Sequence, residues 1–108
     1  MKGDYTMKNR LTKSEAEALW ERVTIAGYLS ELLNRLDQAA YTADLEEMNR
    51  RLAELRGYLT ALAHFKHLSL RQVNDFGRLI DAAKKPFGVY GKQYWDQHAA
   101  HIVGNQEL

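Results

Sequence analysis

Apolar residues recur at intervals of three and four along most of this chain, the spacing that keeps side chains on one face of an α-helix. The first run follows Thr12 and Glu15, which are spaced as in a capping box, so we predict a helix from about Lys13. Its apolar face comprises Leu19, Val23, Ala26, Leu29, Leu33, Leu36 and Ala40. We expect this helix to contact more than one neighbour, because four further apolar residues widen that face: Trp20, Ile25, Tyr28 and Leu32.

A second run with the same spacing follows a break in phase at residues 41–44. Thr42 or Asp44 can cap the new helix, which we expect to run to about Lys66. Its apolar positions are Leu45, Met48, Leu52, Leu55, Leu59 and Leu62. A connection this short places consecutive helices antiparallel, so we predict a long helical hairpin. The alternative is one continuous helix of roughly fifty residues, whose apolar face would have to be covered by a partner chain.

Shorter helices complete the predicted fold. Ser69 and Gln72 repeat the capping-box spacing and open a helix over residues 70–84, which ends there because Pro86 disfavours helical geometry in the residue before it. Residues 86–91 predict a loop, and a last helix runs over residues 92–103 to Gly104. We therefore predict an all-α bundle of three or four helices, in which one or two shorter C-terminal helices pack across the open end of the long antiparallel hairpin.

Length and composition limit the kind of protein this can be. A chain of 108 residues, 45% apolar and 27% charged, is large enough for one hydrophobic core. We predict a single domain at residues 12–104, with a flexible arm at 1–11 and a flexible tail at 105–108. The absence of cysteine excludes disulfides, zinc–thiolate sites and thiol nucleophiles. The sequence has neither a secretory signal nor an apolar run of membrane-spanning length, so we expect a cytoplasmic protein without membrane contact.

Charge is unevenly distributed along the chain although the formal net charge is only +1. Residues 14–47 contain eight acidic and two basic residues, whereas residues 48–95 contain three acidic and nine basic residues. This asymmetry has two interpretations: an acidic helix packs beside basic ones, or the basic part forms a surface that attracts an anionic partner.

Candidate catalytic and cofactor-binding motifs are weak, so we predict that the protein is not an enzyme and uses no cofactor. None of the three serines is predicted to lie on a strained turn beside a base. The acidic residues alternate with basic ones along helix faces, as on solvated surfaces. The run at residues 88–92 has two glycines and a lysine, but it lacks the glycine spacing and the hydroxyl residue of a phosphate-binding loop.

The four histidines form two pairs, His64 with His67 and His98 with His101. A separation of three residues puts both imidazoles of a pair on one helix face, where they could ligate a metal. Both pairs also fall in the last turn of a predicted helix, where an imidazole interacts favourably with the helix dipole. We favour the second interpretation because it explains both pairs, and we predict no metal site.

A helix-turn-helix is one interpretation of residues 58–82. Helices at 58–66 and 70–82 would flank a turn at 67–69, but Lys66 occupies a position expected to be apolar and the turn lacks glycine. Two helices joined by a short turn also occur in any helical bundle. The nucleic-acid-binding residues would be Arg71, Asn74, Arg78, Lys84, Lys85 and Lys92.

The segment at residues 84–95 interleaves basic and aromatic side chains around a loop bracketed by glycines. Large aromatic anchors and basic residues are typical of protein interfaces. We therefore predict a partner-binding site comprising Lys84, Lys85, Phe87, Tyr90, Lys92, Tyr94 and Trp95. The alternative is that Phe87, Val89 and Trp95 fold back and close the open end of the hairpin.

From these patterns we predict a non-enzymatic protein–protein interaction module: a small adaptor or inhibitor that docks on a larger protein and modulates it. Small all-helical proteins encoded by phages and plasmids are of this kind. The alternative function is a nucleic-acid-binding transcriptional regulator with a degenerate helix-turn-helix. The long apolar stripe of the hairpin also predicts self-association, as a homodimer through the hairpin.

Overall fold

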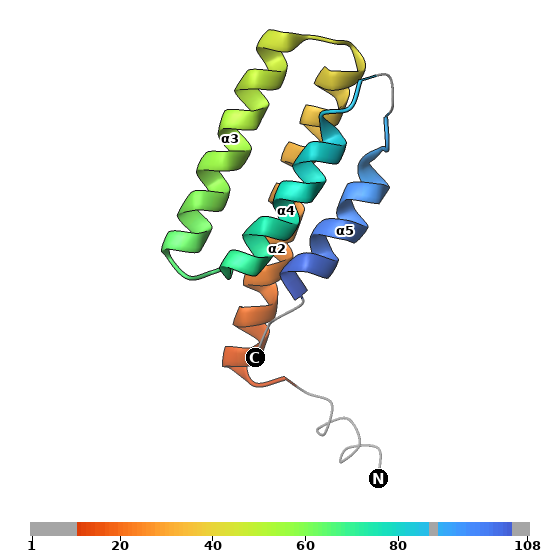
Figure 1. Cartoon of the computed structure of the whole chain (residues 1–108). Helices are drawn as coiled ribbons and strands as arrows, with labels where there is room; N and C mark the ends of the chain where they lie inside the picture. The colour runs from red at the N-terminus through yellow and green to blue at the C-terminus, as the bar shows by residue number, and fades with distance from the viewer. Residues whose placement is uncertain (1–10, 87–88, 105–108) are drawn as a thin grey trace.

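The computed structural model describes residues 11–86 and 89–104, which form four α-helices and no strand (Figure 1). The predicted all-α class is confirmed. The predicted tail, and all of the predicted arm except Leu11, lie outside the described residues. No helix in the described part of the chain is both long enough and apolar enough to cross a membrane. The helices are α2 (Lys13–Tyr41), α3 (Leu45–His64), α4 (Leu70–Ala83) and α5 (Lys92–Gly104).

Three of the helices begin where local side-chain chemistry predicts. Thr12 Oγ1 accepts a hydrogen bond from the N–H of Glu15 at 3.1 Å, and the Glu15 carboxylate accepts one from the N–H of Thr12 at 2.8 Å. Ser69 and Gln72 form the second predicted capping box with the same two distances. Asp44, one of the two expected caps, accepts from the N–H of the third residue of α3 at 3.1 Å. The capping signals in the sequence are therefore confirmed.

The end of α3 differs slightly from its prediction. We expected the helix to reach about Lys66, but it ends at His64. Lys66 has a φ of +63°, which lies outside the right-handed helix, and the N–H of His67 donates to the carbonyl of Leu62 at 2.8 Å. The chain thus closes α3 with a left-handed residue that is not glycine, which the sequence pattern did not indicate.

Helix α2 is the centre of the bundle, because each of the other three helices packs against it. Its buried apolar face comprises Ile25, Ala26, Leu29, Leu32, Leu33 and Leu36. Helix α5 makes the most extensive contact with α2. Trp95, near the start of α5, reaches Asp37, and Val103, near its end, lies beside Val23. The expectation that the shorter helices pack across the open end of the hairpin is therefore wrong for α5, which lies along α2.

The N-terminal part of α2 extends beyond the rest of the bundle (Figure 1). At about 1.5 Å per residue, the 29 residues of α2 span roughly 43 Å and the 20 residues of α3 roughly 30 Å. Leu19, Trp20 and Val23 lie in the N-terminal half of α2 and are 46%, 71% and 53% exposed. The prediction that Leu19 and Val23 belong to the core is therefore wrong, because the end of α5 borders these two side chains but does not cover them.

Candidate protein-interaction surface

The loop between α4 and α5 is tied to the bundle by one buried carboxylate. Asp37, near the C-terminal end of α2, is fully buried. Its Oδ2 atom accepts hydrogen bonds from the N–H of Tyr90 at 2.8 Å, from the N–H of Gly91 at 3.4 Å and from the indole N–H of Trp95 at 2.8 Å. Asp37 thereby fixes both the end of the loop and the first turn of α5.

Asp37 also holds the chain where it enters α5. Gly91, just before α5, has a φ of +93°, a conformation that glycine adopts without strain. The carboxylate of Asp37 binds the N–H groups of Tyr90 and Gly91 before the helix, and the indole of Trp95 within its first turn. The entry into α5 is therefore fixed by a side chain of a different helix.

Sequence reasoning did not identify Asp37 as part of a site, although one signal was present. Asp37 follows Leu33 by four residues and precedes Ala40 by three, which is a position on the apolar face of α2. An acidic residue on such a face needs buried donors, because an unpaired buried charge is costly. The identity of those donors depends on α5, which is more than fifty residues away (about 53 to 58 positions).

Four rings cluster above this carboxylate. Tyr90 and Tyr94 stack with ring centroids 4.5 Å apart, and Trp95 meets the edge of each at 5.3 and 4.8 Å. His98 lies against Tyr94 at 4.3 Å. Trp95 is fully buried and Tyr94 is half-buried. The prediction of Trp95 as a partner anchor is thus corrected: it closes the core, as the alternative interpretation expected for this residue.

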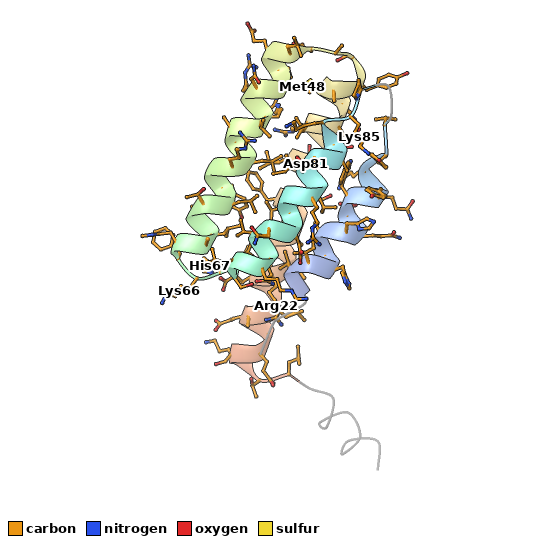
Figure 2. All side chains as sticks on the ribbon, viewed as in Figure 1. Arg22, Met48, Lys66, His67, Asp81 and Lys85 are labelled. Atoms are coloured by element: carbon orange, nitrogen blue, oxygen red, sulfur yellow. The ribbon has the colours of Figure 1, made fainter. Side chains whose placement is uncertain are left out.

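Part of the predicted binding segment does lie on the surface. Val89 is 52% exposed, so it does not fold back as Trp95 does, and Tyr90 is 43% exposed. Lys85, beyond the end of α4, is exposed at the same end of the bundle (Figure 2). Tyr41, one turn of α2 beyond Asp37, is 54% exposed. We call these four residues, Tyr41, Lys85, Val89 and Tyr90, the Tyr90 surface.

Lys84 and Lys92, two other residues of the predicted segment, are less available to a partner than Lys85 is. Lys84 is half-buried at the end of α4, and Phe87 lies outside the described residues. Lys92 is exposed, but its Nζ atom donates to Asp96 Oδ1 at 3.1 Å within α5. Asp96 also accepts from the buried hydroxyl of Ser30 on α2. Both hydrogen bonds lower the pKa of Asp96, and the one from Ser30 has the larger effect. The lowered pKa keeps Asp96 charged and so favours its ion pair with Lys92.

The predicted nucleic-acid-binding residues do not gather on one surface. Arg71, Asn74 and Arg78 are exposed on one face of α4, but Asp75 lies 3.6 Å from Arg78 on that helix. Asp81 is exposed farther along α4. Of the remaining three residues, Lys84 and Lys85 follow the end of α4 and Lys92 belongs to α5. The carboxylates of Asp75 and Asp81 thus interrupt the basic face of α4.

The histidine pairs are not joined to further metal ligands in the described part of the chain, where no group of three or more His, Cys, Asp or Glu side chains is arranged to hold a metal. The Nδ1 atom of His67 lies 2.5 Å from Oε1 of Glu21, which connects the α3–α4 turn to α2. His98 packs on Tyr94 instead.

Comparison with known protein families, with curated proteins and with solved structures found no match. The function is therefore inferred from the surfaces of this chain alone.

Proposed function

We propose that the protein is a non-enzymatic interaction module, a small adaptor or inhibitor that docks on a larger protein through the Tyr90 surface. Helices α2 and α3 serve in this proposal as a long antiparallel hairpin that holds the surface. The observation that carries the proposal is a loop with exposed apolar side chains whose backbone is hydrogen-bonded to the buried carboxylate of Asp37.

Exposure and preorganisation both favour binding at this surface. Tyr41, Val89 and Tyr90 each leave about half of their area in water, although burial would be favourable. Tyrosine is enriched among the residues that dominate binding energy. The bonds to Asp37 fix the loop before a partner arrives, which lowers the entropic cost of binding. The ammonium group of Lys85 has no hydrogen-bond or ion-pair partner among the described residues, so it is available to an acidic group of the partner.

The test is affinity capture from the native host with the wild-type chain, a Tyr90→Ala variant and a matched Phe65→Ala variant. Tyr90 bonds to Asp37 through its backbone N–H, so the substitution leaves that contact in place. Phe65 is 67% exposed and lies in the α3–α4 turn, at the other end of α3 from its junction with α2. We expect one partner to be retained by wild type and Phe65→Ala, and to bind Tyr90→Ala about tenfold or more weakly.

Circular dichroism of the variants checks that the helices are intact. Equal capture of every partner by wild type and folded Tyr90→Ala would exclude the Tyr90 surface as the contact. If Phe65→Ala alone lost the partner, the contact would lie at the opposite end of the bundle.

A nucleic-acid-binding regulator is the second candidate, and the exposed row of Arg71, Asn74 and Arg78 on α4 favours it. Phosphate contacts would give binding to random duplex DNA that weakens steeply as salt concentration rises. Arg78→Ala would weaken that binding on all sequences alike and reduce its salt dependence. No detectable binding to duplex DNA at low salt would eliminate this candidate.

A further inference from the structure

A second exposed apolar surface lies on the N-terminal half of α2, where Leu19 and Val23 border the end of α5 without being covered by it. It comprises Leu19, Trp20 and Val23, and we call it the α2 ledge. Trp20 is 71% exposed, the largest exposed fraction of any aromatic side chain among the described residues. Buried tryptophans are the commonest anchors of protein interfaces, so an exposed one beside two aliphatic residues marks a docking surface. Glu17, one turn before Trp20, is exposed and has no partner among the described residues.

A groove of about 360 Å³ lies between α3 and α4. Leu59 and Ile80 are buried at its base and Val73 is half-buried. Its other lining residues are Arg56, Thr60, Asn74 and Gly77. A Cβ atom added to Gly77 would meet nothing within 4 Å, so the wall of the groove is open at that residue. The groove thus combines an apolar base with a polar rim, which is the form of a site for a large apolar side chain.

The ledge and the groove are complementary in charge. Arg56, on the rim of the groove, has no hydrogen-bond or ion-pair partner in the described part of the chain. Glu17 is equally unpaired beside the ledge. Insertion of Trp20 into the groove would bring a free carboxylate to the rim that holds a free guanidinium, and such pairing favours the correct partner over others.

The ledge cannot reach the groove of its own chain, because residues 13–41 form one continuous helix. A symmetric pairing of two α2 ledges would not bring an opposite charge to Glu17. Antiparallel α2 helices centred on the ledge, near Glu21, would place Glu17 of one copy at the level of Ile25 of the other, which is uncharged. The α3–α4 groove, in contrast, offers Glu17 the guanidinium of Arg56.

We propose that the α2 ledge of one copy docks in the α3–α4 groove of a second copy. The two surfaces differ, so the contact is heterologous and each added copy leaves one ledge and one groove open. The assembly therefore grows head to tail instead of stopping at a symmetric dimer. Three side chains bury less area than a standard protein interface, so association is weak and becomes visible at high protein concentration.

The contact is tested by mixing two purified variants that each lack one surface. Trp20→Ala removes the anchor and keeps the groove. Gly77→Phe is designed to fill the groove and keeps the ledge, and a Cβ atom at Gly77 meets nothing within 4 Å. In light scattering, each variant alone is expected to stay at 12.5 kDa, the mass of one chain. An equimolar mixture is expected to form a 1:1 dimer and to grow no further, whereas the mass of wild type rises with concentration past that of a dimer.

Several outcomes would overturn the proposal: a monomeric mixture, a monomeric wild type at the highest soluble concentration, or assembly of Gly77→Phe alone. A wild-type mass that stops at two copies would indicate a symmetric dimer instead. If Gly77→Phe does not fold, Arg56→Glu takes its place as the groove variant. Combining Arg56→Glu with Glu17→Arg in one chain is then expected to restore assembly that each change alone weakens.

Two control variants separate this contact from the proposed function. Leu45→Ala truncates a side chain that is 72% exposed at the start of α3, away from the ledge and the groove lining, and is expected to assemble as wild type does. Tyr90→Ala is also expected to assemble normally. Loss of assembly in Tyr90→Ala would contradict the ledge–groove contact, while the capture experiment on the Tyr90 surface would stand unaffected.

Discussion

At the scale of single residues, Asp37 has the largest structural role. It is a fully buried carboxylate that accepts from two backbone N–H groups and one indole N–H. Its other oxygen, Oδ1, is buried without a donor among the described residues. These three hydrogen bonds link α2, the loop and α5 through one side chain.

We expect Asp37→Ala to lower the free energy of unfolding by about 3 kcal/mol, because it leaves buried N–H donors without an acceptor. Asp37→Asn keeps one acceptor oxygen and is expected to cost less. Urea denaturation followed by circular dichroism measures both effects. Glu31→Ala, at an exposed carboxylate paired with Arg35 on the same helix, is the control, and an equal loss in both alanine variants would contradict the role of Asp37.

Asp96 is expected to make stability depend on pH. The hydrogen bond from Ser30 and the ion pair with Lys92 lower the pKa of Asp96 in the folded state from its ordinary value of 3.8. The resulting stabilisation is present above the unfolded-state pKa and is lost as the pH falls through the folded-state pKa. Urea midpoints measured from pH 7 down to about pH 2.5 should therefore fall more steeply for wild type than for Asp96→Asn.

Asp81→Asn is the matched control for this pH dependence, because Asp81 is exposed and has no hydrogen-bond partner among the described residues. The urea midpoint of Asp81→Asn is expected to depend on pH in the same way as that of wild type. Parallel curves for wild type and Asp96→Asn would show that the contact with Ser30 does not stabilise the fold.

At the scale of elements, α5 is held at both ends by side chains of other helices. Asp37 of α2 binds the indole of Trp95 near its start. Near its end, Gln72 of α4 donates from Nε2 to the carbonyls of Ile102 and Val103 at 3.0 and 3.4 Å. The last carbonyls of a helix have no partners inside it, so this amide satisfies groups that would otherwise be buried unpaired. Gln72 also closes the capping box of α4, so one side chain joins the start of α4 to the end of α5.

Gln72→Glu is expected to separate these two roles. A glutamate can still accept from the N–H of Ser69, but it cannot donate to Ile102 and repels its carbonyl oxygen. Hydrogen exchange should therefore remain slow at the start of α4 and become faster in the last turn of α5. Ser69→Ala should instead make hydrogen exchange faster at the start of α4 and lower the free energy of unfolding by about 1 kcal/mol. Unchanged exchange of α5 in Gln72→Glu would refute the link.

At the scale of the whole molecule, the length of α2 determines what remains exposed. The other helices cover its middle and C-terminal parts, where residues such as Leu29, Leu33 and Leu36 are fully buried. They leave the side chains of the α2 ledge about half exposed or more. The bundle therefore presents apolar side chains at two separate places, the ledge on the N-terminal half of α2 and the Tyr90 surface near the other end of that helix. In our proposals, the ledge contacts a second copy of the chain and the Tyr90 surface contacts a different protein.

The sequence by itself determined the elements of this fold. Helix periodicity, two capping boxes and the cap at Asp44 predicted the four helices and most of their boundaries, because these signals act between residues three or four positions apart. The same local information also named the 84–95 segment as a place where aromatic and basic residues gather.

Only the tertiary structure decided which of those side chains are exposed and therefore available to a partner. Trp95 and Trp20 both lie on predicted helices, yet one is fully buried and the other is 71% exposed. The difference depends on where α5 ends along α2, and that follows from contacts between residues more than fifty positions apart (about 58 for Asp37 and Trp95). Burial is a property of packing between elements, so a pattern along one helix predicts its apolar face but not how much of that face its neighbours cover.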